Sequence, residues 1–303
     1  MSARWWVAVG ALSLSLAPVL IDLSGTDAAT ASFYRCLLAL PFLLPVVLPE
    51  YRREGLPGRR QYAYGLAAGV CFAGDMVLWT QAIREVGAGL STVLVNIQVV
   101  LVPLLAWLVD REPVPRRFLF WLPVLVAGTA LTGGLVDSGT SGSDPQAGTV
   151  HAVLAALCYS GFLFLLRKGG FQGHVKVTYM LVVVTAAAVS ALAGVVHYGL
   201  DFAPGLPAVA LLALAAVSSG VIGWLLVAIH SPHLASHVGA VLLLLTPVGA
   251  LGLGVAVLGE RPTALQLVGC ALILAAAYFT VGRRGRPSRA AADSGSARRV
   301  PAG

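Results

Sequence analysis

Charged side chains are scarce in this chain. Only 11% of its 303 residues are Asp, Glu, Lys or Arg, whereas 58% are hydrophobic and the mean hydropathy is +0.85. A soluble domain carries roughly 25% charged residues, because its surface must be wetted. The deficit excludes an ordinary soluble protein and predicts an all-α integral membrane protein.

Cysteine is also rare, and its positions argue against a disulfide framework or a metal set. Cys36, Cys71, Cys158 and Cys270 all fall inside apolar runs, where cysteine serves as a small packing residue. The sequence lacks a Walker A phosphate-binding motif, which disfavours ATP-driven pumping by this chain alone. No cofactor is expected.

Ten apolar runs predict ten transmembrane helices, since about 20 residues rising about 1.5 Å each cross a hydrocarbon core of about 30 Å. Their approximate ranges are 4–23, 28–49, 61–83, 87–109, 115–135, 148–167, 176–197, 206–229, 234–258 and 263–282. The longest interior loop, 136–147, is rich in Gly, Ser and Asp, and we interpret it as the linker between a first half (4–135) and a second half (148–283). The tail, 284–303, lacks apolar periodicity and is expected to be disordered in the cytoplasm.

The basic residues predict the orientation. With the N-terminus in the cytoplasm, 17 of the 20 Lys and Arg residues fall in cytoplasmic segments, and the outer loops hold mainly acids. By the positive-inside rule both termini are cytoplasmic, and the bias toward Arg suits a bacterial plasma (inner) membrane. This distribution explains the net charge of +7 without nucleic acid as a partner. Since each half has five spans, an odd number, the second half is expected to be inverted.

A repeated stretch supports the division into halves. Residues 90–113 and 238–262 each hold an apolar span with an internal proline, followed by a Glu beside an Arg and then another apolar span. A shift of 148 positions lays Glu112 on Glu260. Inverted repeats are typical of secondary transporters, because two similar halves can exchange inward-facing and outward-facing shapes.

The sequence resembles the EamA-type members of the drug/metabolite transporter (DMT) superfamily. The resemblance rests on the five-plus-five arrangement, on an Arg early in the second span (SFYRCLLALPFLLP) and on the second hinge (GERPTALQLVGCALILAAAYF). It covers about residues 5–282, although the first hinge reads VDREPVPRR where Gly-Glu-Arg is usual. It implies a permease or exporter that moves a small metabolite or drug by alternating access, without a hydrolysable cofactor. The substrate, the direction and the coupling ion are not implied.

Polar residues inside the spans form the candidate substrate-binding site, because such residues need a partner or a water-filled cavity in the bilayer. Arg35, Asp75 and Asn96 lie on consecutive spans, about 10–13 Å from the outer ends by helical rise. We predict that Arg35 and Asp75 face each other, either as a structural ion pair or as contacts to substrate or a coupling proton. Trp79 joins the site because it follows Asp75 by one helical turn. Gln98 is two residues after Asn96, so one of these two amides is expected to serve helix packing.

Three further residues complete the candidate site. Tyr159, Ser219 and Thr246 lie near the middle of their spans, beside small residues or a proline, and close helix packing is the alternative interpretation. Three prolines lie inside spans: Pro18, Pro103 and Pro247. Each frees a backbone carbonyl, so each proline either provides an acceptor for ligand or only kinks its helix.

Three histidines near the eighth loop do not predict a metal site. A Ser-Pro step interrupts the segment that holds His230, His233 and His237, and no carboxylate or cysteine nearby completes a tetrahedral set. Solvated histidines or a weak pH sensor fit them better.

Other functions remain as alternatives. No catalytic set lies at matching depth in the spans, so an intramembrane enzyme is not expected. A nucleotide-sugar-like exchanger would need several cations in its cavity, and only Arg35 qualifies. A scaffold or sensor without transport also stays open, because fold does not prove function. The sequence leaves open whether the protein forms a homodimer.

Overall fold

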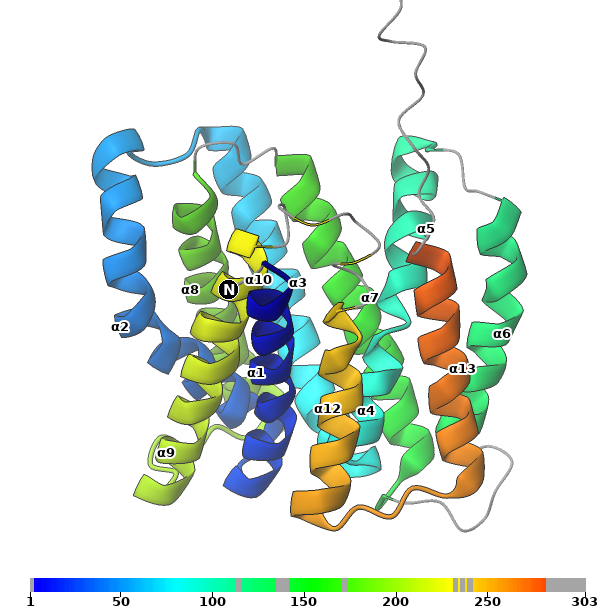
Figure 1. The fold of residues 1–303 in the computed structure, drawn as a ribbon. Coiled ribbons are helices and arrows are strands. Elements are labelled where there is room, and N and C mark those ends of the chain that lie inside the picture. The colour runs from blue at the N-terminus through cyan, green and yellow to red at the C-terminus, as the bar shows by residue number, and fades with distance from the viewer. Residues whose placement is uncertain are drawn as a thin grey trace, which may run out of the picture.

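The protein is a bundle of helices. The computed structural model describes residues 3–112, 116–134, 142–169, 174–230, 234, 238 and 242–281, and this part of the chain contains no strand. The helices stand side by side (Figure 1). The first half holds α1 (Ala3–Ser24), α2 (Ala28–Glu54), α3 (Arg59–Val86), α4 (Ala88–Val95), α5 (Gln98–Asp110) and α6 (Arg116–Thr132). The second holds α7 (Pro145–Gly169), α8 (Val175–Ala193), α9 (Leu206–Ala215), α10 (Trp224–His230), α12 (Leu245–Leu253) and α13 (Ala264–Val281), with π-helical segments η1 (Gly194–Tyr198), η2 (Ala216–Gly223) and η4 (Gly254–Leu258).

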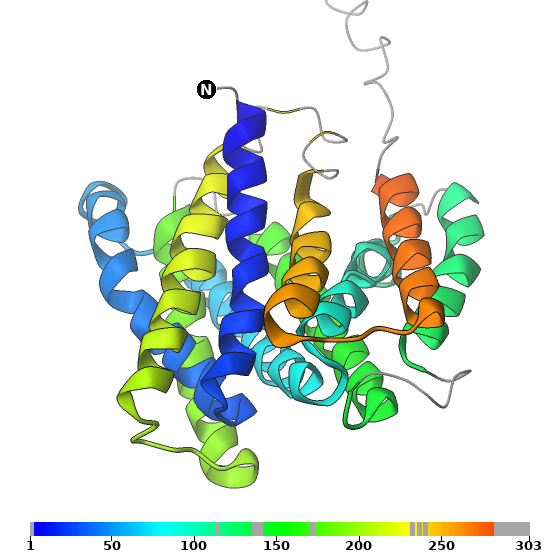
Figure 2. The same ribbon diagram turned by 60° about the horizontal axis from the view of Figure 1, so that its bottom comes forward.

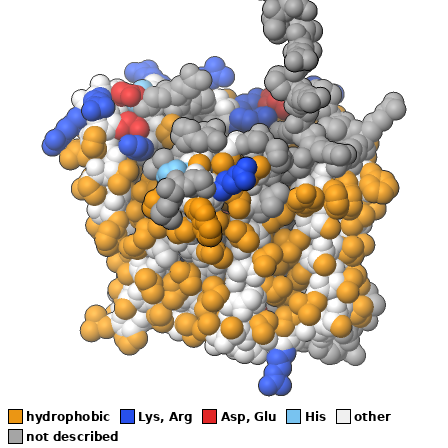
Figure 3. All heavy atoms as spheres, in the orientation of Figure 1, with side chains coloured by type: hydrophobic (Ala, Val, Ile, Leu, Met, Phe, Trp, Pro, Cys, Tyr) orange, Lys and Arg blue, Asp and Glu red, His pale blue; other side chains and the backbone are white. Residues whose placement is uncertain are grey.

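Many of these helices can cross a membrane. Seven helical stretches are long and apolar enough, covering residues 3–24, 28–54, 59–86, 88–110, 145–169, 175–196 and 206–227. Three shorter apolar helices cover residues 119–132, 245–258 and 264–279. Each of the ten segments overlaps one predicted span. The face in Figure 3 is mainly hydrophobic through its middle, and most of its charged side chains gather along the upper edge. The chain is therefore a multi-pass membrane protein.

The two ends of the bundle differ in charge. At one end α2 finishes with Arg52 and Arg53, and α3 begins with Arg59 and Arg60. We call this the basic end, which is at the top of Figure 1. The opposite end, where α3 ends and α4 begins, is called the Glu260 end.

The two halves meet along α3 and α7, which run antiparallel. The rings of Phe72 and Phe162 lie 4.9 Å apart, while Glu85 contacts His151 farther toward the Glu260 end. Small residues let these helices approach closely, as is usual for helices packed in lipid. This contact brings the first half against the second along most of the bundle.

Two of the cysteines lie in that interface. A Cβ added to Gly74 of α3 would lie 3.0 Å from the sulfur of Cys158, and one added to Gly161 of α7 would lie 3.2 Å from the sulfur of Cys71. All four cysteines are free thiols. Cys71 and Cys158 thus act as small packing residues that face glycines.

At the edge of the bundle, α6 and α13 lie side by side (Figures 1 and 2). A Cβ on Gly269 would lie 2.6 Å from the carbonyl oxygen of Gly128, so glycine is required at this crossing. The side-chain amide of Gln266 donates a hydrogen bond of 3.3 Å to the carbonyl of Thr132.

The start of α7 differs from the prediction. It begins at Pro145, inside the range 136–147 that we interpreted as linker. The Asp144 side chain accepts a hydrogen bond of 3.1 Å from the N–H of Ala147, which satisfies one unpaired donor of the first turn. Proline is also favoured at the first helical position, because its missing N–H has no partner to lose there. The predicted tail, 284–303, lies outside the described residues.

Candidate functional site

A cavity of ≈ 170 Å³ lies inside the bundle between helices of both halves. All eight predicted site residues line it: Arg35, Asp75, Trp79, Asn96, Gln98, Tyr159, Ser219 and Thr246. The other lining residues are Leu14, Ala17, Phe72, Met76, Thr92, Val95, Trp224, Leu243 and Pro247. The fold therefore gathers the selected polar residues around one space, while their role in binding substrate stays a prediction.

Arg35 contacts an aromatic ring and not a carboxylate. It is 8% exposed, and its guanidinium carbon lies 5.4 Å from the centroid of the Trp79 ring. A cation–π contact contributes about 0.5–2 kcal/mol, and more as it is desolvated. Neither an ion pair nor a hydrogen bond joins Arg35 to Asp75 in the described part of the chain. Of the two interpretations offered for Arg35 and Asp75, the direct ion pair is therefore not formed in this structure, where the guanidinium packs against Trp79 instead.

Three polar groups of lining residues have no hydrogen-bond partner among the described residues. Asp75 is 3% exposed and makes no hydrogen bond or ion pair there. The Nη1 of Arg35 and the indole Nε1 of Trp79 are buried donors without an acceptor. Buried polar groups are normally hydrogen-bonded, so this concentration of unsatisfied groups distinguishes the cavity from the packed core.

Asn96 and Gln98 both line the cavity, contrary to the prediction that one of them serves packing. The prediction assumed a continuous helix. Instead, the N–H groups of Asn96 and Ile97 bond to carbonyls three residues earlier, and the chain restarts as α5 at Gln98. This break lets residues two apart reach the same space. The Asn96 amide also donates a hydrogen bond of 2.9 Å to the carbonyl of Thr92.

The hydroxyl groups of Ser219 and Thr246 are bonded to backbone. Ser219 donates to the carbonyl of Ala215 at 2.7 Å, within its own span. Thr246 donates to the carbonyl of Ala11 at 3.1 Å and so ties α12 to α1. Both residues line the cavity while also serving helix packing, so the two interpretations are compatible at these positions.

One of the three span prolines leaves a carbonyl without its helical donor at a lining residue. Pro18 lies inside α1 and has no N–H for the carbonyl of Leu14, which lines the cavity. Pro247 also lines the cavity, but it is the third residue of α12, where an N–H has no partner within the helix. Pro103 lies in α5 away from the lining, which fits a role limited to helix shape there.

The comparisons with known proteins agree with this architecture. A model of the EamA-like transporter family matches residues 1–134 and again residues 146–282. The chain belongs to the EamA-like transporter family. The predicted resemblance is thus confirmed, and the family model occurs twice in the chain.

Solved structures share the fold of this EamA-like transporter. Twenty chains match it, and one, described as "Crystal structure of protein", has a TM-score of 0.58 at 16% sequence identity. That match covers 91% of this chain and 95% of the other, and it shows a common fold alone. No curated protein matches the sequence.

The second hinge of this EamA-like chain contacts the first half directly. The carboxylate of Glu260 accepts hydrogen bonds from the N–H of Ala88 at 2.5 Å and of Gly89 at 3.2 Å. These N–H groups begin α4 and have no partner within the helix, and the helix dipole favours an acid there. Burial raises the pKa of Glu260, and the two N–H groups lower it by a smaller amount. A Cβ at Gly254 would collide with the carboxylate, so glycine makes room for it.

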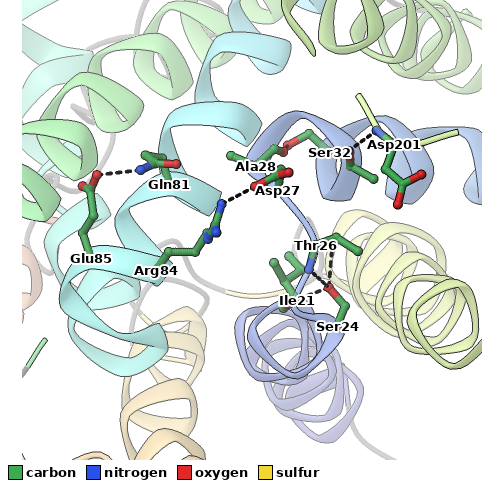
Figure 4. A network of polar contacts seen from close by, with 11 residues as sticks. Ile21, Ser24, Thr26, Asp27, Ala28, Ser32, Gln81, Arg84, Glu85 and Asp201 are labelled. Atoms are coloured by element: carbon green, nitrogen blue, oxygen red, sulfur yellow. Dashed lines mark hydrogen bonds and ion pairs between the residues drawn. The ribbon is translucent and has the colours of Figure 1, made fainter. Parts of the chain in front are cut away.

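A second set of contacts lies at the same end of the bundle (Figure 4). Arg84 of α3 pairs with Asp27, which precedes α2, at 2.7 Å. Gln81 donates to Glu85 at 2.6 Å. Glu85 also contacts His151 of α7 at 2.5 Å. These contacts link α2, α3 and α7 at the Glu260 end.

The basic end has its own contacts between the halves. Glu50 of α2 accepts hydrogen bonds from the N–H groups of Lys176 and Val177 at 2.7 and 2.9 Å, at the start of α8. Lys168 of α7 pairs with Asp110 of α5. At each end of the bundle, acidic side chains of one half therefore contact the start or the end of a helix in the other half.

The two hinge acids behave differently. Glu112, which the repeat aligns with Glu260, is half-exposed and pairs with Arg167 at 3.1 Å. An ion pair at the surface contributes about 0–1 kcal/mol, whereas Glu260 caps a buried helix terminus. The first hinge, which holds Glu112, also lacks the usual Gly-Glu-Arg sequence of the second hinge.

Of the three histidines, only His230 is described. Its ring stacks on Trp6 with centroids 5.7 Å apart, and its Nδ1 lies 3.1 Å from the carbonyl oxygen of Leu226. His233 and His237 lie outside the described residues. Within the described ranges, no group of three His, Cys, Asp or Glu side chains is arranged to hold a metal ion.

Sequence reasoning missed the apolar part of the lining. Phe72, Asp75, Met76 and Trp79 recur at the spacing of one helix face, so the helical period around Asp75 could have identified Phe72 and Met76. Thr92 lies one turn before Asn96 and could have been found in the same way.

Proposed function

We propose that the protein is a secondary active transporter that moves a small metabolite or drug across the bacterial plasma membrane by alternating access. The observation that carries this proposal is the cavity between the two EamA repeats, where Arg35, Asp75 and Trp79 keep polar atoms without a protein partner. A solute that enters the cavity supplies a partner for Asp75, and release restores the empty form.

In this proposal the chain crosses the membrane ten times as two inverted five-helix repeats, with both termini in the cytoplasm. The arrangement of charge supports it. The ends of α2 and α7 and the start of α3 bring Arg52, Arg53, Arg59, Arg167 and Lys168 to the basic end. Positive loops remain in the cytoplasm, which makes the basic end the inner one.

The contacts at the two ends serve as alternating gates. At the Glu260 end the gate is the carboxylate of Glu260 on the start of α4. At the basic end it is the carboxylate of Glu50 on the start of α8. Each gate joins the first half to the second, so rocking of the halves opens one end as it breaks that set of hydrogen bonds.

Asp75 carries the coupling proton in this proposal. No other carboxylate lines the cavity within the described residues, and a proton there must exchange with whatever cationic group Asp75 binds. Transport by Asp75→Asn should lose its response to a pH gradient. Gradient dependence that persists in Asp75→Asn contradicts this role.

The test is transport by purified protein in liposomes. Uptake and efflux are measured for labelled amino acids, sugars, nucleosides, organic acids and cationic drugs, with and without a pH gradient. We expect saturable flux of at least one class, retained in Trp107→Phe, whose side chain is half-exposed on α5. Flux no greater than in protein-free liposomes for every class overturns the proposal.

A further inference from the structure

We propose that the protein binds an anionic phospholipid in a second cavity at the basic end, with an acyl chain in the cavity and the phosphate beside Arg52 and Arg59. We call this space the flank cavity. It shares no lining residue with the central cavity, so this inference goes beyond the proposed transport function. It follows from the exposure of the flank cavity, from its composition and from the charges beside it.

The flank cavity lies between α2 and α3 of the first half and α8 of the second, and α8 packs against both (Figure 1). Its volume is ≈ 270 Å³, and every lining residue is Leu, Val, Met, Pro or Tyr. Leu44 and Val184 are 51% and 43% exposed, so the cavity opens on the outside of the bundle. In a multi-pass membrane protein this side faces lipid, and an apolar space of this volume holds part of an acyl chain.

One end of the flank cavity lies at the level of the lipid headgroups. The short connection from α2 to α3 contributes Leu56 and Pro57 to the lining, and Tyr51 and Tyr62 flank that connection. Both tyrosines are exposed, at 47% and 41%. Tyrosine is enriched at the interface of membrane and water, because its ring is apolar and its hydroxyl group is polar. The flank cavity therefore connects the acyl region with the headgroup region.

Exposed cations lie beside this end of the flank cavity. Arg52 follows Tyr51 directly, and Arg59 is three residues before Tyr62, on the same face of α3. Neither arginine makes an ion pair or a side-chain hydrogen bond with another described residue. Lys176, near the start of α8, adds a third exposed cation from the second half.

The neighbouring acids do not neutralise these cations, because they are engaged elsewhere. Glu50 accepts hydrogen bonds from two N–H groups at the start of α8, and Glu54 lies 3.9 Å from the ring of His174. Positive charge therefore remains beside an apolar cavity. An anionic phospholipid matches both parts, since its acyl chains are apolar and its phosphate accepts charge-assisted hydrogen bonds from arginine.

A second copy of the chain fits this surface less well than a lipid does. A symmetric dimer places the same surface of each chain against the other, so it would bring the two sets of arginines together. Like charges that face each other oppose association. A zwitterionic lipid could fill the apolar part, but its headgroup would bring a further cation to the arginines.

The experiment titrates lipids with matched acyl chains onto the purified full-length protein in detergent. Native mass spectrometry measures the binding of phosphatidylglycerol, which is anionic, and of phosphatidylcholine, which is zwitterionic. One cation near an anionic headgroup strengthens binding about fivefold, so two should make the first phosphatidylglycerol bind about 25-fold more tightly than phosphatidylcholine. Glycerol phosphate, which lacks acyl chains, should bind far more weakly than phosphatidylglycerol.

Neighbouring arginines locate the phosphate. Arg52→Gln and Arg59→Gln should each weaken the binding of phosphatidylglycerol about fivefold. Arg60→Gln is the matched control, because it removes the same charge from the next residue. The guanidinium carbon of Arg60 lies 5.8 Å from the centroid of the Tyr64 ring, and Tyr64 does not line the flank cavity. Arg60→Gln should leave the affinity nearly unchanged.

A filled cavity tests the place of the acyl chain. Val184→Phe puts a larger side chain into the flank cavity and should weaken the binding of both lipids. Val70→Phe is the matched control, because Val70 is 51% exposed on α3 and lines neither cavity. If a variant fails to fold, the lipid series on the unmodified protein still decides whether an anionic site exists.

The outcomes are distinct. A preference for phosphatidylglycerol that depends on Arg52, Arg59 and Val184 supports the site. Equal affinity for the two lipids, equal losses in Arg59→Gln and Arg60→Gln, or equally tight binding of glycerol phosphate overturns it. A dimer that Val184→Phe dissociates assigns the flank cavity to a second copy and also overturns it. These measurements do not use flux, so failure of the lipid site leaves the proposed transporter standing.

Discussion

The carboxylate of Glu260 in the second half accepts a hydrogen bond of 2.5 Å from the backbone N–H of Ala88 in the first half. Ala88 begins α4, a helix of only eight residues that ends at the break before Gln98. Thr92 and Val95 of this helix line the cavity. The hinge of the second repeat therefore fixes the position of a wall of the candidate site.

Removing this cap should destabilise the protein. Glu260→Ala leaves the first N–H groups of α4 without an acceptor and should cost about 1–2 kcal/mol, as other cap losses do. Glu260→Gln keeps a carbonyl oxygen and should cost less. Thermal unfolding in detergent measures both. Glu112→Ala is the control, since its half-exposed ion pair should contribute less than about 1 kcal/mol. Equal losses at Glu112 and Glu260 contradict the cap.

A paired glycine test examines the space around the same carboxylate. A Cβ at Gly254 would collide with Glu260, whereas one at Gly252 meets nothing within 4 Å. Gly254→Ala should therefore lower Tm by displacing the carboxylate. Gly252→Ala should leave Tm unchanged or raise it, because alanine restricts the unfolded chain. The account is in error if the two substitutions have the same effect.

Protonation of Glu260 should affect stability with a definite sign. Burial raises the pKa of Glu260 above its ordinary value of 4.5, so the folded protein binds this proton more tightly than the unfolded chain does. The stabilisation of the fold by this proton is complete below pH 4.5 and is lost as the pH rises through the raised pKa of Glu260. The Tm of the unmodified protein should fall relative to that of Glu260→Gln from pH 4.5 upward. A difference that is constant with pH, or that changes in the opposite direction, contradicts this.

The orientation can be tested by labelling single cysteines from each side. Gly58 and Ser143 are exposed and lie at the basic end and the Glu260 end, respectively. In cells, a membrane-impermeant maleimide should label Ser143→Cys and should reach Gly58→Cys only after the membrane is permeabilised. The native cysteines are replaced by serine or alanine beforehand. Labelling of both positions in intact cells contradicts the topology.

Much of the fold could be predicted because lipid imposes simple rules. Apolar runs of about 20 residues locate the helices, and the positions of Arg and Lys separate the two ends. The starts of helices were less predictable. Pro145 and Asp144 start α7 earlier than hydropathy indicates, because capping and not apolar content decides where a helix begins.

The site shows both the strength and the limit of sequence reasoning. Polar residues inside apolar spans are so costly that each of those selected lines the cavity. Their partners could not be predicted in the same way. The contact of Arg35 with Trp79 depends on how α2 packs against α3, and the shared position of Asn96 and Gln98 depends on a helix break without proline or glycine at the break itself.

The most direct test of alternating access is the accessibility of the cavity from each side. Thr92 lines the cavity, and Thr92→Cys in a background without native cysteines provides a single thiol there. An impermeant thiol reagent is added to right-side-out and to inside-out vesicles. Alternating access predicts labelling in both preparations, with substrate slowing both rates. Labelling from one side only, whatever the substrate or gradient, would contradict the account.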